Sequence, residues 1–179
     1  VMSDIAFMAM DLQAHALPRL AHRFVNRYVE LSGDHDGVRV LGYYLVHRAL
    51  VRAKVELLRS AQGGQAGAEA ASHVHTASHY LELALQLCLP PQPALMLTHG
   101  FSGSGKTTLT QGLLEAVGAI RIRADVERKR LAGLQADARS GSALQAGLYS
   151  EAMTQATYAR LLERAEPVLT GGRHAILDA

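Results

Sequence analysis

The sequence has a single cysteine, Cys88, and no tryptophan, and aromatic residues make up only 5% of its 179 positions. One cysteine excludes an internal disulfide, which fits the reducing environment of the cytoplasm. No apolar run approaches the roughly 20 residues that a membrane helix needs, and the N-terminus lacks the basic and apolar regions of a signal peptide. We therefore expect a cytoplasmic protein without a membrane partner.

Neither sign of charge dominates the chain. Lysine and arginine total 18 against 16 aspartates and glutamates, so the formal net charge of +2 is too small to indicate a nucleic-acid partner by itself. Hydrophobic residues at 49% and charged residues at 19% are typical of a folded globular protein. The length suits one ordinary domain or two small or partial ones.

What the sequence does contain is a phosphate-binding pattern at residues 100–107, which satisfies G-x-x-x-x-G-K-[ST]. A short apolar run precedes it and a helical pattern of leucines follows it, so the helix dipole would add to the anion site. Lys106 would reach the β- and γ-phosphates, and the Thr107 hydroxyl would bind Mg²⁺. We therefore predict ATP and Mg²⁺ as ligands of Gly100, Ser102, Gly103, Ser104, Gly105, Lys106, Thr107 and Thr108.

The first part of the chain has helical patterns at 3–14, 18–31 and 38–60. Ser3 can cap the first, and Leu58 is among the residues of the third that we expect in a core. A small, flexible segment follows, and a helical pattern resumes at 68–89 until a cluster of prolines.

From residue 94 the patterns alternate between strand and helix, which indicates an α/β layered fold. We expect strands at 94–98, 119–123 and 174–178 and helices at 106–117, from Val126 and at 150–170. The predicted fold class is α/β, a helical N-terminal segment followed by a three-layer P-loop NTPase domain. The predicted boundaries are 1–60, 61–92 and 93–179. Because a complete P-loop domain needs more strands, we expect a truncated fragment of a longer protein.

Asp125 is a second candidate site residue, placed after the strand pattern at 119–123. Ligands of open α/β sheets bind outside the carboxyl ends of the strands, and a carboxylate there can accept the proton of an attacking hydroxyl. Arg123 and Arg128 beside it suit an anionic substrate. The alternative is that Asp125 caps the following helix and that the basic residues form a solvated face. These residues alone favour neither reading.

Other side chains have simpler readings. Asp178 ends the last apolar run, where it would orient substrate, hold the water shell of Mg²⁺ or merely enter a turn. His73, His75 and His79 do not complete a metal site, so a solvated helix surface explains them better. Residues 34–36 suit a polar turn, and Cys88 among leucines suits a core.

In several of these segments, the chain resembles a family of bacterial fusion proteins. In it an aminoglycoside-phosphotransferase-like domain precedes a P-loop kinase domain of the polynucleotide-kinase and zeta-toxin type, an AAA family ATPase. Residues 4–12 and 43–54 resemble the closing helices of the first domain. The P-loop, residues 123–131 and residues 174–179 resemble the first three strands of the kinase.

The resemblance implies catalytic roles for Lys106, Asp125 and Arg128, with Asp125 as the base in a D-x-x-R arrangement and Arg128 on the substrate. It places the catalytic loop of the phosphotransferase-like domain before Val1, and the lid and later strands of the kinase after Ala179. We therefore expect intramolecular contacts with those missing parts.

The sequence thus predicts a kinase that transfers the γ-phosphoryl group of ATP to a hydroxyl of a small molecule or nucleotide, with Arg123, Arg128 and Asp178 on the substrate. The alternative is a nucleotide-binding regulatory module in which ATP occupancy reorients the neighbouring domain. Phosphorylation of nucleic-acid ends ranks lower, because no stacking aromatics flank the basic run at 121–130.

Overall fold

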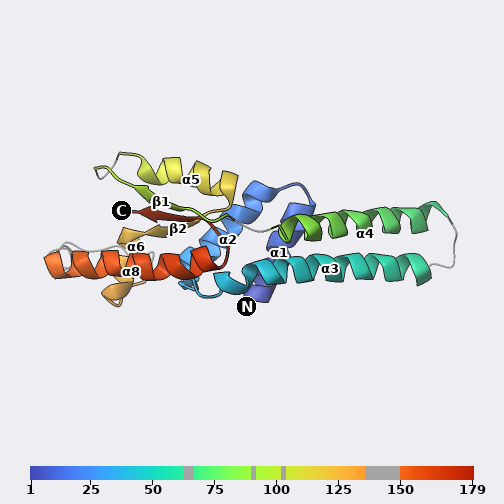
Figure 1. Cartoon of the computed structure of the whole chain (residues 1–179), viewed down its shortest axis with the longest axis horizontal. Coiled ribbons are helices and arrows are strands. Elements are labelled where there is room, and N and C mark those ends of the chain that lie inside the picture. The colour runs from blue at the N-terminus through green and yellow to red at the C-terminus, as the bar shows by residue number, and fades with distance from the viewer. Residues whose placement is uncertain (63–66, 90–91, 102–103, 136–149) are drawn as a thin grey trace. The chain divides into compact units, whose positions relative to one another are not determined.

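The computed structural model of the chain describes residues 1–62, 67–89, 92–101, 104–135 and 150–179 (Figure 1). The chain divides into two compact units, which are described separately. The first contains residues 1–21 and 40–90, and the second contains residues 22–39 and 91–179. Within the described residues, no helix is both long and apolar enough to cross a membrane.

The first unit is helical. It contains α1 (Met2–Ala14), most of α3 (Val38–Gln62) and α4 (Ala68–Leu87). Its core includes Met10 of α1 and a stripe of α3 residues spaced four apart, namely Leu41, Leu45, Ala49 and Ala53. This spacing keeps one face of the long helix buried and turns the remaining faces toward solvent.

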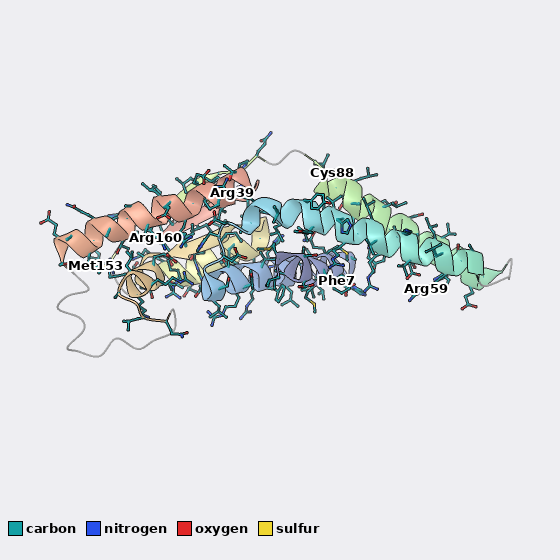
Figure 2. All side chains as sticks on the ribbon, turned by 90° about the horizontal axis from the view of Figure 1, so that it is seen from below. Phe7, Arg39, Arg59, Cys88, Met153 and Arg160 are labelled. Carbon is teal, nitrogen blue, oxygen red and sulfur yellow. The ribbon has the colours of Figure 1, made fainter. Side chains whose placement is uncertain are left out.

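Three expectations for the first unit are wrong. Ser3 does not cap α1, whose N-cap is Val1, and its hydroxyl instead accepts a hydrogen bond of 2.9 Å from Arg48 Nη2. Leu58 is 48% exposed because it falls off the buried stripe of α3. Cys88 is exposed rather than part of a core, because α4 ends at Leu87 and Cys88 is its C-cap residue (Figure 2).

The second unit contains a parallel three-stranded sheet in the order β1-β3-β2. The strands are β1 (Leu95–Thr98), β2 (Ile120–Arg123) and β3 (Ala175–Asp178). In Figure 1, α5 (Lys106–Val117) lies above the sheet and α8 (Glu151–Thr170) lies below it. All four residues of the central strand β3 are buried, as expected for a strand covered on both faces.

The register of the sheet aligns the last residues of its strands. Asp178 at the end of β3 pairs with Thr98 of β1 on one side and with Arg123 of β2 on the other. The carboxyl ends of all three strands therefore lie at one edge. The loop before α5 follows β1 at this edge, and α6 (Ala124–Leu131) follows β2.

The predicted strands and most of the predicted helices are confirmed to within about two residues, the usual precision of helix ends. The chain is mixed α/β, mostly helical with a small parallel sheet. The helix predicted from Val126 begins earlier, at Ala124, because the chain enters it directly from β2.

The compact units do not follow the predicted boundaries, since residues 22–39 group with the P-loop part of the chain. The cause is α2 (Pro18–Ser32), whose later residues bond to the sheet layer. Asn26 Oδ1 accepts the backbone N–H of Arg121 at 2.7 Å, and His22 Nδ1 contacts the carbonyl of Glu115 at 2.8 Å. The Asn26 side chain of α2 thus accepts a hydrogen bond from a backbone N–H of the edge strand β2.

Candidate functional site

A cavity of about 580 Å³ in the second unit lies where the three strands end. Its walls come from five segments: the loop and first turn of α5, the end of β2, the start of α6, the end of β3 and one tyrosine of α8. The lining residues are Gly100, Ser104, Gly105, Lys106, Thr107, Arg123, Ala124, Asp125, Arg128, Tyr158, Asp178 and Ala179. The fold therefore brings most of the predicted site residues into one hollow.

The loop before α5 has backbone conformations that favour glycine. Gly105, the N-cap of α5, has φ of 83°, and Gly100 has φ of 150°. A side chain at either position would be strained, which is why the pattern requires glycine there. Ser102 and Gly103 lie outside the described residues, and Thr108 is exposed and does not line the cavity.

Lys106 folds back over this loop. Its ammonium donates hydrogen bonds to the carbonyl oxygens of Gly100 at 2.5 Å and Phe101 at 3.0 Å. The charge is thus held beside the loop whose backbone N–H groups suit an anion. A bound phosphate would offer Lys106 charged oxygens in place of the neutral carbonyls, and such hydrogen bonds are stronger.

Thr107 and Asp178 place a hydroxyl and a carboxylate side by side next to the loop. Thr107 Oγ1 donates to Asp178 Oδ2 at 3.1 Å, and Thr98 Oγ1 donates to Asp178 Oδ1 at 3.0 Å. Asp178 is only 8% exposed, so these two hydroxyls fix its carboxylate. A hydroxyl and a carboxylate next to a phosphate loop are the protein ligands that suit Mg²⁺ in P-loop proteins.

Asp125 does not cap α6, so that alternative is wrong. The N-cap of α6 is Arg123, without a side-chain capping bond, and Asp125 stands in the first turn. Its carboxylate accepts a hydrogen bond of 2.9 Å from Arg123 Nη2 and lines the cavity together with Arg128. Arg123 also donates to Glu30 Oε1 of α2 at 3.3 Å.

Sequence reasoning missed several residues that the fold places around the cavity. Tyr158 of α8 lines it and is 53% exposed. Arg121 of β2 is 5% exposed and lies behind the first turns of α5, and Glu30 is 9% exposed. A charged residue inside a strand with isoleucine on either side was the one available signal for Arg121. Nothing local marks Tyr158 or Glu30.

The polar turn before α3 also contains a buried group. His35 is 1% exposed, and burial lowers the pKa of its imidazole while the nearby Glu127 carboxylate opposes that shift. Glu127 of α6 is equally buried, at 1% exposed, and pairs with Arg130. Arg160 and Arg164 of α8 approach its other oxygen at 3.8 and 3.9 Å.

The histidines of α4 do not gather at a metal site. Among the residues that the structure describes, no group of three or more His, Cys, Asp or Glu side chains could hold a metal ion. His73 contacts Glu56 Oε2 at 2.6 Å and His79 contacts the carbonyl of Ala14 at 2.8 Å. His75 and His79 are exposed, as a helix surface predicts, and His73 is half-buried against Glu56.

The glycine-rich loop, its lysine, and the Thr107–Asp178 pair are together the features of a P-loop phosphate site. Residues 95–179 match the AAA domain family. That family belongs to the P-loop NTPases, a class that includes kinases. The match covers the sheet, α5, α6 and α8, whereas α2 precedes it.

Curated relatives match almost the whole chain. The uncharacterized proteins Rv2004c of Mycobacterium tuberculosis and Mb2027c of Mycobacterium bovis are each 37% identical to it over 176 residues, which are 98% of this chain and 34% of each relative. The chain thus spans about 34% of the length of these relatives. No solved structure matches the chain.

Proposed function

We propose that the AAA domain contains the donor site of an ATP-dependent kinase that phosphorylates a hydroxyl of a small molecule or nucleotide. One observation carries the proposal: a single cavity joins the P-loop residues Lys106 and Thr107 to Asp125 and Arg128. The first pair suits the phosphates of ATP, and the second pair suits an acceptor.

The residues present fit a nucleotide with Mg²⁺. Gly100 and Gly105 allow the backbone to approach phosphates closely, and Lys106 supplies a positive charge. Thr107 and Asp178 would hold the metal and its water shell. This proposal moves Asp178 from the substrate, where the sequence placed it, to the metal. The metal would neutralise charge that builds up on the phosphate oxygens.

Asp125 is the proposed general base. Its carboxylate would take the proton of the acceptor hydroxyl while that oxygen forms a bond to the γ-phosphorus. The bond between that phosphorus and the bridging oxygen breaks, and ADP leaves with the electron pair. Lys106 and the N-terminal amides of α5 would stabilise the charge, and Arg128 would hold an anionic group of the acceptor.

The ion pair of Arg123 with Asp125 bears on the acceptor site. Arg123 bridges Asp125 at 2.9 Å and Glu30 at 3.3 Å, so it is already bound on both sides. We therefore assign Arg123 first to orienting the Asp125 carboxylate. Contact of Arg123 with an anionic acceptor would exchange one of these partners for the substrate.

The helical first unit fits the closing helices of a phosphotransferase-like domain in this proposal. The alignment with the relatives includes 98% of the chain, and therefore both compact units. The chain covers 34% of each relative's length. The whole protein would then combine this AAA domain with further parts that complete the acceptor site. Its cytoplasmic location remains part of the same proposal.

The test is a screen of phosphoryl transfer from γ-labelled ATP in the presence of Mg²⁺. Sugars, nucleosides, nucleoside monophosphates and 5′-hydroxyl oligonucleotides serve as candidate acceptors. A labelled acceptor supports the kinase. ATP binding with slow hydrolysis and no labelled acceptor across the panel would support a nucleotide-binding regulatory module instead.

Tyr158 favours including nucleotides in the panel. It is the aromatic residue among the described residues lining the cavity, and it is 53% exposed. A base stacked on an aromatic ring gains about 1–3 kcal/mol. If a nucleotide is the acceptor, Tyr158→Ala should raise its KM while Tyr158→Phe should not. Leu162→Ala, 58% exposed on the same helix, is the matched control.

A further inference from the structure

Arg121 places a positive charge inside the AAA domain, directly behind the phosphate loop. It stands in the second position of β2, between two buried isoleucines, and is 5% exposed. Nη1 donates to the carbonyl of Thr107 at 2.8 Å and to Thr110 Oγ1 at 3.0 Å, and Nη2 donates to Gln111 Oε1 at 3.1 Å. All three acceptors belong to the first two turns of α5.

These three acceptors are neutral. Within the described part of the chain, Arg121 forms no ion pair, and its Nε is buried without a hydrogen-bond partner. Glu30, Asp125 and Asp178 act on it only over longer distances, and burial lowers the pKa of its guanidinium. The charge is therefore desolvated and not cancelled by direct contact with a carboxylate.

Packing and helix stability do not account for a charge at this place. The N-terminal end of a helix is itself positive, so a cation near the first turns of α5 is unfavourable for the helix. A neutral side chain that hydrogen-bonds, or an apolar one of similar length, would avoid the cost of burying a charge. A negatively charged ligand at the same helix end reverses this balance, because it is attracted to both the helix dipole and the guanidinium.

We infer that Arg121 is a positioning residue of the nucleotide site, which holds Thr107 in place and adds to the positive potential that binds the phosphates. The inference rests on the proposed function, since it requires a phosphate in the loop. The Thr107 carbonyl is held by Arg121 while the Thr107 hydroxyl is held by Asp178. The residue that carries the Mg²⁺ hydroxyl is thus fixed from two strands of the sheet.

Helix α2 extends this support beyond the matched AAA segment. Asn26 Oδ1 accepts the backbone N–H of Arg121 at 2.7 Å, and Asn26 is 3% exposed. The contact fixes β2 at the residue whose side chain reaches α5. Asn26 therefore anchors the backbone of Arg121, whereas the charge of Arg121 acts on the ligand, and the two roles can be separated by mutation.

The experiment measures Kd values of ATP, ADP and AMP with Mg²⁺ for wild type, Arg121→Gln and Arg121→Met. Loss of a nearby charge should raise the Kd of ATP by about tenfold, that of ADP by less and that of AMP by about twofold at most, because the ligands differ in negative charge. Arg121→Lys, which keeps the charge, should restore most of the ATP affinity. Both neutral variants should unfold at the wild-type denaturant concentration or above it.

Two controls separate charge from structure. Asn26→Ala should lower the unfolding free energy. Any increase that it causes in Kd should be the same for ATP, ADP and AMP. Arg39→Gln removes an equal charge at a residue, labelled in Figure 2, that pairs with Glu166 and does not line the cavity; it should leave all three Kd values unchanged.

An equal loss of affinity for all three ligands, or no loss, would overturn the inference while leaving the proposed function intact. Failure of the wild-type chain to bind ATP at all would instead reject the proposed function, and the inference with it.

Discussion

Thr107 Oγ1 donates a hydrogen bond of 3.1 Å to Asp178 Oδ2, although 71 positions separate the two residues in the chain. The parallel register brings the end of β3 beside the P-loop strand, so the contact follows directly from the sheet topology. Thr98 holds the second oxygen of the same carboxylate. The hydroxyl and the carboxylate that we propose as holders of Mg²⁺ are thereby oriented by the fold itself.

This contact leads to the first prediction. Asp178→Asn should raise the Mg²⁺ concentration needed for half-maximal ATP binding by about 10–100-fold, the usual cost of losing such a supporting group. Titrations of ATP at several Mg²⁺ concentrations measure it. Asp36→Asn, at a position 74% exposed in the same unit, should show the wild-type Mg²⁺ dependence. An unchanged requirement in Asp178→Asn would rule out its role at the metal.

The second prediction concerns the buried carboxylate of α6. Glu127→Gln removes the negative charge that faces Arg130, Arg160 and Arg164, and Arg160 is labelled on α8 in Figure 2. Breaking a buried ion pair on one side costs about 3–5 kcal/mol of unfolding free energy. Chemical denaturation followed by circular dichroism measures this loss.

The matched control for that measurement is Glu163→Gln. Glu163 also pairs with Arg160, but it is 61% exposed, so its removal should cost no more than about 1 kcal/mol. Equal effects of the two substitutions would show that burial does not set the strength of the Glu127 cluster.

The third prediction is a pH dependence of stability. Burial lowers the pKa of His35 in the folded state, and Arg164 and Arg130 add to that effect against the opposing Glu127. Below the ordinary histidine value of about 6.5, the unfolded chain therefore binds more protons than the folded one. The unfolding free energy should fall as the pH decreases from about 6.5 toward the lowered folded pKa.

His35→Asn keeps a donor for the carbonyl of Gly33, which His35 Nδ1 contacts at 3.0 Å, but cannot titrate. Its unfolding free energy should therefore decrease less steeply over this pH range than that of the wild type. His22 contributes a similar slope, because burial lowers its pKa as well, so part of the dependence should remain. The exposed His75→Asn variant serves as the control, and a slope in His35→Asn equal to that of the wild type would contradict the assignment.

Local patterns predicted the elements of residues 95–179, the segment that matches the AAA domain family, well. The glycine loop, the apolar runs of the strands and the leucines of α5 each belong to one short segment, so their periodicity is visible without the fold. The carboxyl ends of the strands were also predictable as the site edge. Lys106, Thr107, Asp125 and Asp178 were therefore candidates before the fold was known, and they now line one cavity.

Contacts between distant segments were not predictable. The helical pattern of α2 says nothing about its partner, so its attachment to β2 through Asn26 was missed. Tyr158 reaches the cavity only because α8 crosses beneath the sheet. One alternative placed the basic residues of 121–130 on a solvated face, yet Arg121 is buried, because α2 packs on the edge strand β2. The burial of Glu127 was not predicted either, and it follows from contact with the arginines of α8.

The most direct test of the account compares ATP binding and phosphoryl transfer in wild type and Asp125→Asn, once the acceptor screen has identified an acceptor. Asp125 lines the same cavity as Lys106 but is not in the phosphate loop. The substitution should leave the Kd of ATP unchanged and slow single-turnover transfer by about 10²–10⁴-fold, the contribution of a general base. Transfer at the wild-type rate in Asp125→Asn would contradict the proposed kinase mechanism.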